Sequence, residues 1–402
     1  MIDRWRWVAL PFCALALTMG VRGAFGVYVL PWEAEFSSTR AEIASVSSLS
    51  FLVYGLGNVV AGVAAERLGV GAVTAASLSL VALGLLGSAA SARLGWVYLF
   101  YGLVASAGFA GASHVTASVA VRQRFPEERR SFALSVVVAG MCAGQMVVVP
   151  AQVLAVGRWG WRPVLAALAG VAVGLAVAAA TSRKSWGGGP SPRTVSGPAQ
   201  SARGAGALLR DFWFWVFLAP YLVCGFTDSG LVDNHLVPYA RSLGASEATV
   251  AGALSVLAVS NLAGTVAAGY LADRWGRARV LGGLYALRAA SLLLLVTGSV
   301  GRLWAFAPLF GATHFATIAP TNTLALSLFH ASAPGLAVGL ASFTHQVGAA
   351  AGALVGGLAF DRLGSYEPAF LSAVALLVAS AAAMEWIHRA RWSGLRWSTH
   401  GT

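Results

Sequence analysis

Long apolar runs separated by short polar clusters set the pattern of this 402-residue chain. Each run has about 20 residues or more, the length that an α-helix needs to cross the hydrocarbon core of a bilayer. The pattern therefore predicts an all-α membrane protein with twelve transmembrane helices. We expect them at 8–31, 42–65, 70–91, 96–121, 132–156, 161–181, 212–238, 247–271, 279–300, 303–329, 336–360 and 366–388.

The polar segments between these runs form two matched sets, one in each half of the chain. G-V-A-A-E-R-L-G at 62–69 matches G-Y-L-A-D-R-W-G at 269–276, and G-R-W-G-W-R-P at 157–163 matches D-R-L-G-S-Y-E-P at 361–368. A long repeat made of hydrophobic spans is typical of secondary transporters, in which two similar bundles hold a substrate site between them. We expect two six-helix, pseudo-symmetric bundles at 1–181 and 212–402, joined by a flexible polar linker at 182–211.

The composition excludes a soluble protein, because only 10% of the residues are charged, against roughly 25% in soluble proteins. The net charge of +12 would by itself suggest a nucleic-acid partner. However, most basic residues fall on one side of the membrane when the N-terminus is cytoplasmic. This bias excludes nucleic acid and predicts a multi-pass protein of the bacterial inner membrane with both termini cytoplasmic. The first run follows Arg4 and Arg6 as in a signal peptide, but it lacks a small-residue cleavage site and is expected to be retained.

No enzyme chemistry and no cofactor are expected. Cys13, Cys142 and Cys224 lie within spans far apart in sequence, which is not the spacing of a disulfide framework or a metal site. A phosphate loop, a Ser/His/Asp set and a nucleotide-binding domain are also missing. A gradient must therefore drive any uphill movement of solute, and we expect a monomer in the lipid bilayer.

The chain resembles the major facilitator superfamily over essentially its full length. The loop motif Gly269-x-x-x-Asp273-Arg274-x-Gly276-Arg277-x-Arg279 carries the resemblance, and the first copy is degraded, with Glu66 in place of the usual Asp. Other segments are similar to bacterial relatives of monocarboxylate and oxalate/formate transporters. They are G-V-R-G-A-F-G-V-Y-V-L-P and E-F-S-S-T-R-A-E-I near the N-terminus, C-G-F-T-D-S-G-L-V-D-N-H-L-V-P-Y-A in the seventh span, and Y-A-L-R and T-H-Q-V-G-A-A-A-G in the ninth and eleventh.

This resemblance implies that helices 1, 4, 7 and 10 line a central cavity and that helices 3, 6, 9 and 12 face lipid. Ionisable groups within a span cost about 2.5–3.5 kcal/mol on insertion scales, so each needs a reason. Four of them, Arg22, His114, Asp228 and His314, fall one on each of the expected lining helices.

Arg22 is the leading candidate for binding an anion. A guanidinium keeps its charge and holds a carboxylate through two hydrogen bonds, and the family resemblance implies an essential basic residue in this part of the first helix. The alternative is a structural ion pair with Asp228. A buried Asp228 can carry a proton through the transport cycle, or it can be only the counter-ion of Arg22. Tyr221 and His235 lie seven residues before and after Asp228, on the same helix face.

Three histidines are further candidates for substrate contact or proton relay, since histidine titrates near neutrality. His114 and His314 occur in the similar segments G-A-S-H-V-T-A and G-A-T-H-F-A-T, and His345 lies in the eleventh span. For His114 and His314 the alternative is a hydrogen bond to a backbone carbonyl between helices. Asp233 and His235 are expected nearer the outer surface, in a solvated vestibule.

Two positions depart from what the resemblance implies. Arg288 lies on a helix expected to face lipid, so we expect it to snorkel or to be paired. Monocarboxylate transporters use an Asp and an Arg one turn apart in the eighth helix, where the best match here is Asn261 and Thr265. Asn261 is kept as a substrate-binding candidate, but the family's main anion clamp is absent.

Charged loops and glycines are expected to serve conformation and packing. Glu66, Arg67, Asp273, Arg274 and Arg277 can form a cytoplasmic ion-pair latch that opens in another conformation, or they can only set the topology; Arg129 and Arg130 are possible latch partners. Glycine-rich faces at Gly348/Gly352/Gly356 and Gly140/Gly144 allow close helix approach.

These features together predict a secondary active transporter with alternating access. The favoured solute is a small monocarboxylate-type anion moved by proton symport. One alternative is a proton-driven exporter of an amphiphilic compound. Another, from a different class, is a non-transporting membrane sensor on the same fold.

Overall fold

The protein is described by a computed structural model over residues 2–125, 127–182, 206, 208–296, 298–329 and 334–392. The secondary structure of these residues is helical, without a β-strand. The helices of the first half, in chain order, are α1 (Ile2–Gly23), α2 (Phe25–Phe36), α3 (Arg40–Leu68), α4 (Val70–Ala89), α5 (Leu94–Val97), α6 (Ser106–Gly111), α7 (His114–Arg124), α8 (Glu127–Ala143), α9 (Val149–Trp159) and α10 (Trp161–Thr181). Two π-helical segments, η1 (Tyr98–Ala105) and η2 (Gly144–Val148), join α5 to α6 and α8 to α9.

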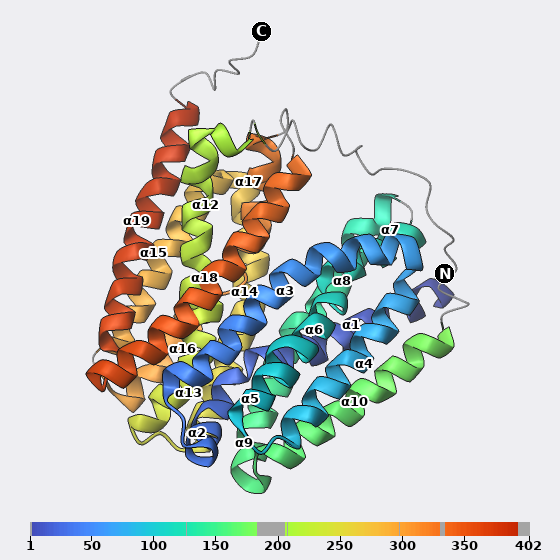
Figure 1. Ribbon diagram of the computed structural model, residues 1–402. Coiled ribbons are helices and arrows are strands. Elements are labelled where there is room, and N and C mark those ends of the chain that lie inside the picture. Colours follow the sequence, from blue (N-terminus) through green and yellow to red (C-terminus); the bar gives the residue numbers. More distant parts are fainter. Residues whose placement is uncertain are drawn as a thin grey trace.

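The second half has the same kind of organisation. Its helices are α12 (Phe212–Gly225), the π-helical η4 (Phe226–Val232), α13 (Asp233–Ser242), α14 (Glu247–Trp275), α15 (Arg277–Val296), the 3₁₀ turn η5 (Val300–Arg302), α16 (Leu303–Gly311), α17 (Ile318–Leu328), α18 (Pro334–Leu363) and α19 (Glu367–Trp392). Figure 1 shows two groups of helices, α1–α10 and α12–α19, inclined to each other.

The all-helical membrane architecture is confirmed, but the twelve-span count is not. Ten of the described helices, or eleven with one bent pair, are long and apolar enough to cross a membrane. The bent pair is 8–23 with α2, at 46°. The run at 303–329 does not form one helix, because the turn residues 312–317 separate α16 from α17. That break turns out to be central to the candidate site.

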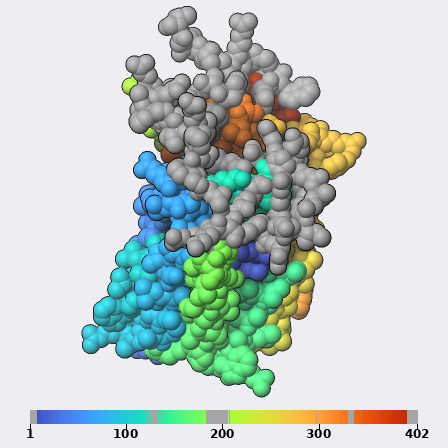
Figure 2. All heavy atoms as spheres, turned by 90° about the vertical axis from the view of Figure 1, so that its right-hand side faces the viewer, coloured from blue at the N-terminus to red at the C-terminus, as the bar shows by residue number. Residues whose placement is uncertain are grey.

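The outer faces of both groups carry apolar side chains that suit lipid. Helices α10 and α4 pack side by side and lie on the face seen in Figure 2, α10 in green and α4 in blue. Leu83, Val171 and Val177 on these two helices are about half exposed. Only a hydrocarbon environment removes the cost of exposing so much apolar surface.

The repeated loop motif has a structural reason in its last glycine. Gly69 ends α3 with φ at 88°, and Gly276 ends α14 with φ at 91°. Both angles lie in the left-handed region that glycine adopts without steric cost. The two matched segments therefore make the same sharp connection to the following helix, α4 in one half and α15 in the other. We call the side on which these loops lie the terminal side, because α19 ends there too (Figure 1).

The glycine faces bring helices into close contact, as predicted. An added Cβ at Gly348 would lie 2.0 Å from the carbonyl oxygen of Leu222, and one at Gly352 would lie 2.1 Å from that of Phe226. Gly144 similarly faces the carbonyl oxygen of Ala16, at 2.2 Å from a built Cβ. These contacts press α18 against α12 and η4, and η2 against α1.

The two groups are tied together on the side opposite the terminal side. The carboxylate of Asp361, at the end of α18, accepts hydrogen bonds from the backbone N–H groups of Arg40 (3.1 Å) and Ala41 (2.8 Å), at the start of α3. The Arg40 side chain donates to Glu33 (3.2 Å) and to the hydroxyl of Tyr366 (2.7 Å). Burial raises the pKa of Tyr366 to about 12, with the Arg40 charge acting in the opposite direction. The arginine therefore donates to a neutral phenol.

Replacing Gly352 by alanine should destabilise the protein. The new methyl group would overlap a backbone oxygen that cannot move freely, which costs about 1–3 kcal/mol and outweighs the roughly 1 kcal/mol gain in helix propensity. Gly339→Ala, on the same helix but with nothing within 4 Å of the built Cβ, is the control. The thermal unfolding midpoint of the purified protein should fall for Gly352→Ala only. Equal midpoints in the two variants would contradict the packing described here.

Candidate functional site

A central cavity between the two groups of helices is the candidate site. Its empty volume is about 870 Å³, including the part open to solvent. Both groups contribute to its walls. The lining residues are Met19, Arg22, Gly23, Phe51, Tyr54, Asn58, His114, Met141, Gln145, Tyr221, Asp228, Ser229, Asp233, His314, Phe315, Ile318, Asn322, Ser342, His345 and Gln346.

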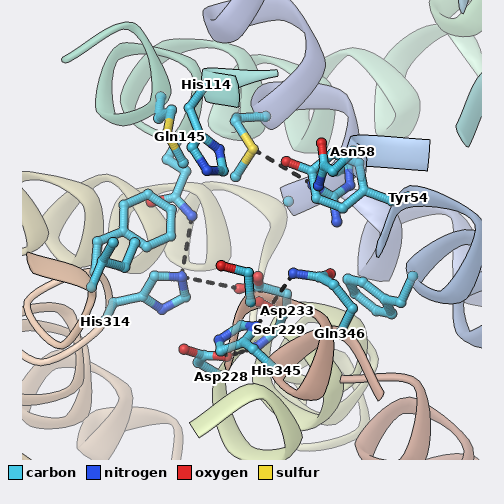
Figure 3. A pocket seen from close by; sticks show the side chains of 18 of the residues that line it. Tyr54, Asn58, His114, Gln145, Asp228, Ser229, Asp233, His314, His345 and Gln346 are labelled. Carbon is cyan, nitrogen blue, oxygen red and sulfur yellow. Dashed lines mark hydrogen bonds and ion pairs between the residues drawn. The ribbon is translucent and has the colours of Figure 1, made fainter. Parts of the chain in front are cut away.

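Most of the predicted site residues meet here. Arg22, His114, Tyr221, Asp228, His314 and His345 all line the cavity, and Figure 3 shows several of them pointing into it from different helices. Asn261 lies behind the wall and is fully buried. Asp233 also lines the cavity, whereas the sequence placed it in an outer vestibule. His235 is not solvated at all, because its ring is fully buried and its Nε2 lies 2.7 Å from the carbonyl oxygen of Ala353.

The similar segments around His114 and His314 lie at corresponding helix breaks. Helix α6 ends at Gly111 and α7 begins at His114, while α16 ends at Gly311 and His314 lies in the turn before α17. Ser113 caps α7 by accepting a hydrogen bond from the backbone of Val115 at 3.2 Å. Each break directs a histidine into the cavity, so the likeness of the two segments reflects a shared local structure.

Asp228 is paired with Arg288 and His345. Its Oδ2 lies 3.4 Å from Nη1 of Arg288, and its Oδ1 lies 3.4 Å from Nε2 of His345. The backbone N–H of Ser229 also donates to the carboxylate. The sequence suggests Arg22 as the partner of Asp228, but the partner is Arg288. Of the two expectations for Arg288, snorkelling or pairing, the structure shows pairing, with the side chain fully buried inside the second group of helices.

Arg288 also holds the break between α16 and α17. Its Nε donates to Oγ1 of Thr313 at 3.2 Å, and its Nη2 donates to the carbonyl oxygens of Thr313 and of His314, the latter at 3.0 Å. A broken helix leaves carbonyl groups without helical partners, and such groups are costly inside a membrane protein. The five donors of one guanidinium satisfy both these carbonyls and the Asp228 carboxylate.

Arg22 is left available for a ligand. Its guanidinium carbon lies 3.6 Å from the centroid of the Tyr54 ring and 5.5 Å from that of Phe51, and Nη1 is 3.8 Å from the sulfur of Met19. Among the described residues, none places a carboxylate within salt-bridge distance of it. A half-buried arginine stacked on an aromatic ring and facing a cavity is well suited to bind an anion.

Gln145 is a site residue that sequence reasoning missed, as it missed Tyr54 and Asn58. It belongs to η2, in the first group, and its side chain reaches two residues of the second group. Nδ2 of Asn261 donates to Oε1 of Gln145 at 2.8 Å, and Nε2 of Gln145 lies 3.3 Å from Nε2 of His314. A neutral amide within an apolar run indicates a functional position less strongly than a charged residue does. Even so, a glutamine in the middle of the fifth predicted span was a detectable sign of a buried polar contact.

Asn261 and Thr265 have a structural role instead of forming an anion clamp. Oδ1 of Asn261 accepts hydrogen bonds from the backbone N–H of Phe315 at 2.9 Å and from the hydroxyl of Thr265 at 3.3 Å. Asn261 therefore satisfies a backbone donor at the helix break, as Arg288 satisfies its carbonyl groups.

In the described part of the chain, one group of potential metal ligands lies in the wall. Donor atoms of Cys224, Asp228 and His345 lie within 4.8 Å of one another. However, the Arg288 guanidinium is 3.1 Å from the sulfur of Cys224 and already neutralises Asp228. A cation would have to displace that charge, so the donor set does not suit a metal ion.

The residues of the predicted latch lie on the terminal side, at the ends of α3 and α14. Arg67, Asp273 and Arg274 are exposed, while Glu66 and Arg277 are half-buried. Arg274 donates to the hydroxyl of Tyr270 on its own helix at 2.8 Å. The side chains of Arg129 and Arg130 lie outside the described part of the structure. The latch therefore stays a prediction.

Membrane-spanning helices in two groups around a polar cavity define a solute transporter rather than an enzyme. The family model described as "Major Facilitator Superfamily" matches residues 11–232 and 219–391, and the chain belongs to this superfamily.

Curated relatives and solved structures agree with this assignment. The chain is 26% identical to monocarboxylate transporter 13 of Bos taurus, over 93% of this chain and 87% of that protein. It is 26% identical to monocarboxylate transporter 11 of Mus musculus, over 91% and 84%. The fold matches a point mutant of the nucleoside transporter NupG with a TM-score of 0.80 at 13% identity, over 96% and 99% of the two chains. A bacterial homologue of the human lysosomal transporter Spinster, at 15% identity over 98% and 99%, gives 0.77.

Removing the Arg288 side chain should be among the most damaging single changes. Arg288→Ala leaves a buried carboxylate and two buried carbonyl groups unpaired, and breaking a buried ion pair costs about 3–5 kcal/mol. Arg279→Ala, an exposed arginine of the same helix, is the control. Thermal unfolding of the purified variants checks the difference. An Arg288→Ala variant as stable as Arg279→Ala would show that the buried network contributes nothing to the fold.

Proposed function

We propose that the protein moves a small monocarboxylate-type anion together with a proton, by alternating access of the central cavity. The observation that carries the proposal is the pairing of Asp228 with Arg288, because it leaves Arg22 free. Because Arg288 already neutralises Asp228, Arg22 is not needed as the counter-ion of that carboxylate. Binding of an anion is then the simplest reason for an arginine at this depth.

The balance of charge supports coupling to a proton. The cavity and its wall hold two arginines, Arg22 and Arg288, and two carboxylates, Asp228 and Asp233. With both carboxylates ionised and the cavity histidines neutral, an anion entering this set leaves one excess negative charge in a low-dielectric site, which is costly. Uptake of one proton with each anion restores the balance. Symport is thus favoured by the same electrostatics that favour the anion.

The similarity to monocarboxylate transporters supports a carboxylate as the solute. The similarity is limited, because the Asp and Arg expected in the eighth helix are replaced here by Asn261 and Thr265. Monocarboxylate transporters 13 and 11 match almost the whole chain. Because Asn261 and Thr265 hold the helix break instead of an anion, the carboxylate would be bound by Arg22. Tyr54 positions that arginine, and Asn58, His114 and Gln145 are the polar groups of the first half that share the wall. The charged, polar lining disfavours export of an amphiphilic compound.

The contacts between the groups fit alternating access. The bonds of Arg40 with Asp361 and Tyr366 close one side, and we propose that they open when the terminal side closes through the latch residues. With a cytoplasmic terminal side, this conformation faces inward. We further propose that the protein works as a monomer in the bacterial inner membrane, with both termini in the cytoplasm.

Arg22 should be indispensable for uptake. In proteoliposomes with an inward proton gradient, radiolabelled L-lactate, propionate and similar short monocarboxylates serve as probes. Arg22→Ala should weaken binding by about 30-fold or more, the equivalent of about 2 kcal/mol for a lost charge partner. Arg22→Lys should weaken it less, because it keeps the charge and loses the bidentate geometry.

Arg93→Ala, an exposed arginine of the same half, should transport as the unmodified protein does. Thermal unfolding checks that the Arg22 variants remain folded. Full carboxylate uptake by Arg22→Ala would reject the anion site. A carrier that moves none of the carboxylates in any variant would reject the proposed function.

A further inference from the structure

The Asp233–His314 pair lies where a proton would be held between two acceptor atoms. Oδ1 of Asp233 lies 3.9 Å from Nε2 of His314, and Figure 3 shows Asp233 between His314 and Gln346. Among the described residues, no hydrogen-bond donor reaches the Asp233 carboxylate. Asp228, by contrast, has the Arg288, His345 and Ser229 groups around it.

A chain of hydrogen bonds fixes which partner donates at His314. The backbone N–H of Phe315 can only donate, so the oxygen of Asn261 must face it, at 2.9 Å. The amide nitrogen of Asn261 must then donate to the oxygen of Gln145, at 2.8 Å. The nitrogen of Gln145 therefore faces His314, at 3.3 Å. Since an amide nitrogen is a donor only, Nε2 of His314 must accept.

Because Nε2 accepts this hydrogen bond, His314 must be neutral, with its proton on Nδ1. That atom is buried and has no hydrogen-bond partner in the described structure. An unpartnered buried donor is costly, so the neutral state gains little stability from its surroundings. Protonation of Nε2 would place two donors, that atom and the Gln145 nitrogen, opposite each other. The protonated ring would instead donate to Asp233.

We infer that Asp233 and His314 together form the proton-binding site, and that Gln145 reports its occupancy to the other half of the molecule. A hydronium ion in the cavity gives its proton to Nε2 of His314 and leaves as water, and the protonated ring turns from Gln145 toward Asp233. The Gln145–His314 bond between the two groups of helices is lost in the same step. Proton binding is thereby linked to the relative position of the two halves, as coupling requires.

Charged groups of both signs lie around the pair. The groups whose charges act on His314 are Asp228, Arg288 and His345, besides Asp233 beside it. Asp228 is already paired with Arg288 and His345, so Asp233 is the carboxylate that lies beside the His314 ring. Arg22 acts on Asp233 across the cavity, and an anion bound to Arg22 would weaken that hold. Proton and anion would then favour each other's binding.

The inference rests on the proposed function only in taking the proton as the coupled ion, and its test needs no solute. Spin labels on Leu68→Cys and Trp275→Cys, at the matching ends of α3 and α14, measure the separation of the two halves on the terminal side. Both residues are exposed. Cys13 and Cys142 are first replaced by alanine, while Cys224 stays because it is fully buried.

Pulsed electron paramagnetic resonance on the full chain in lipid nanodiscs is recorded from about pH 8 to about pH 5, where histidine titrates. The ratio of the two distance populations should change by about 2- to 10-fold, the worth of one neutral hydrogen bond. His314→Gln should abolish the change, because glutamine can bond to Gln145 but cannot take up a proton. Asp233→Asn should move the change to lower pH.

His235→Gln is the matched control, since it replaces another fully buried histidine outside the cavity, and it should respond as the unmodified protein does. A pH-independent ratio in the unmodified protein would overturn the inference while leaving carboxylate transport intact. It would also be overturned if His314→Gln kept the response and Asp228→Asn removed it. A normal response in a protein that transports no carboxylate would reject the proposed function alone.

Discussion

The buried guanidinium of Arg288 is the interaction on which the site depends. It neutralises Asp228 and satisfies two carbonyl groups of the broken helix, at Thr313 and His314. Without it, the turn at 312–317 would leave unpaired backbone groups at membrane depth, which is tolerated only where protein or water satisfies them. The break in turn places His314 in the cavity. One side chain on α15 thus fixes the shape of the break and the charge of the wall.

Much of the architecture follows from the sequence because its causes are local. Apolar run length predicts helices, and the repeated glycines predict repeated sharp turns, which Gly69 and Gly276 make with positive φ. The cost of charge in lipid indicates Arg22, Asp228, His114, His314 and His345 as candidate site residues, and all five line the cavity. The spacing of Gly348 and Gly352, four residues apart on one helix face, likewise predicts close helix packing.

The partners of these residues were not predictable in the same way. Asp228 can pair with any buried cation, and only the packing of α15 against α16 and α17 brings Arg288 to it instead of Arg22. The helix break at 312–317 has no proline within it, and its stability comes from Arg288 and Asn261 on other helices. Gln145 is important because it lies between the two groups of helices. Its amide is neutral, so membrane-insertion energies do not single it out as they single out a charged residue. Hydrogen bonds between residues far apart in sequence cannot be predicted from the periodic pattern of apolar and polar residues.

These contacts lead to one electrostatic account of transport, in which fixed charges are balanced when the cavity is empty. In the proposed mechanism Arg22 and Arg288 match Asp228 and Asp233, and an anion and a proton bind together to keep the balance. The Gln145–His314 bond makes this balance a mechanical signal, because it joins the two halves only while His314 is neutral. In this proposal, charge and conformation are coupled through the Nε2 atom of His314.

The most direct test of this balance is whether transport moves net charge. Purified protein is reconstituted into liposomes, and uptake of a transported short monocarboxylate is measured with a pH gradient, with a potassium-diffusion potential, and with both. If one proton accompanies each anion, the pH gradient alone should drive accumulation, and a membrane potential of either sign should leave the rate unchanged. Accumulation driven by the membrane potential alone would contradict the account.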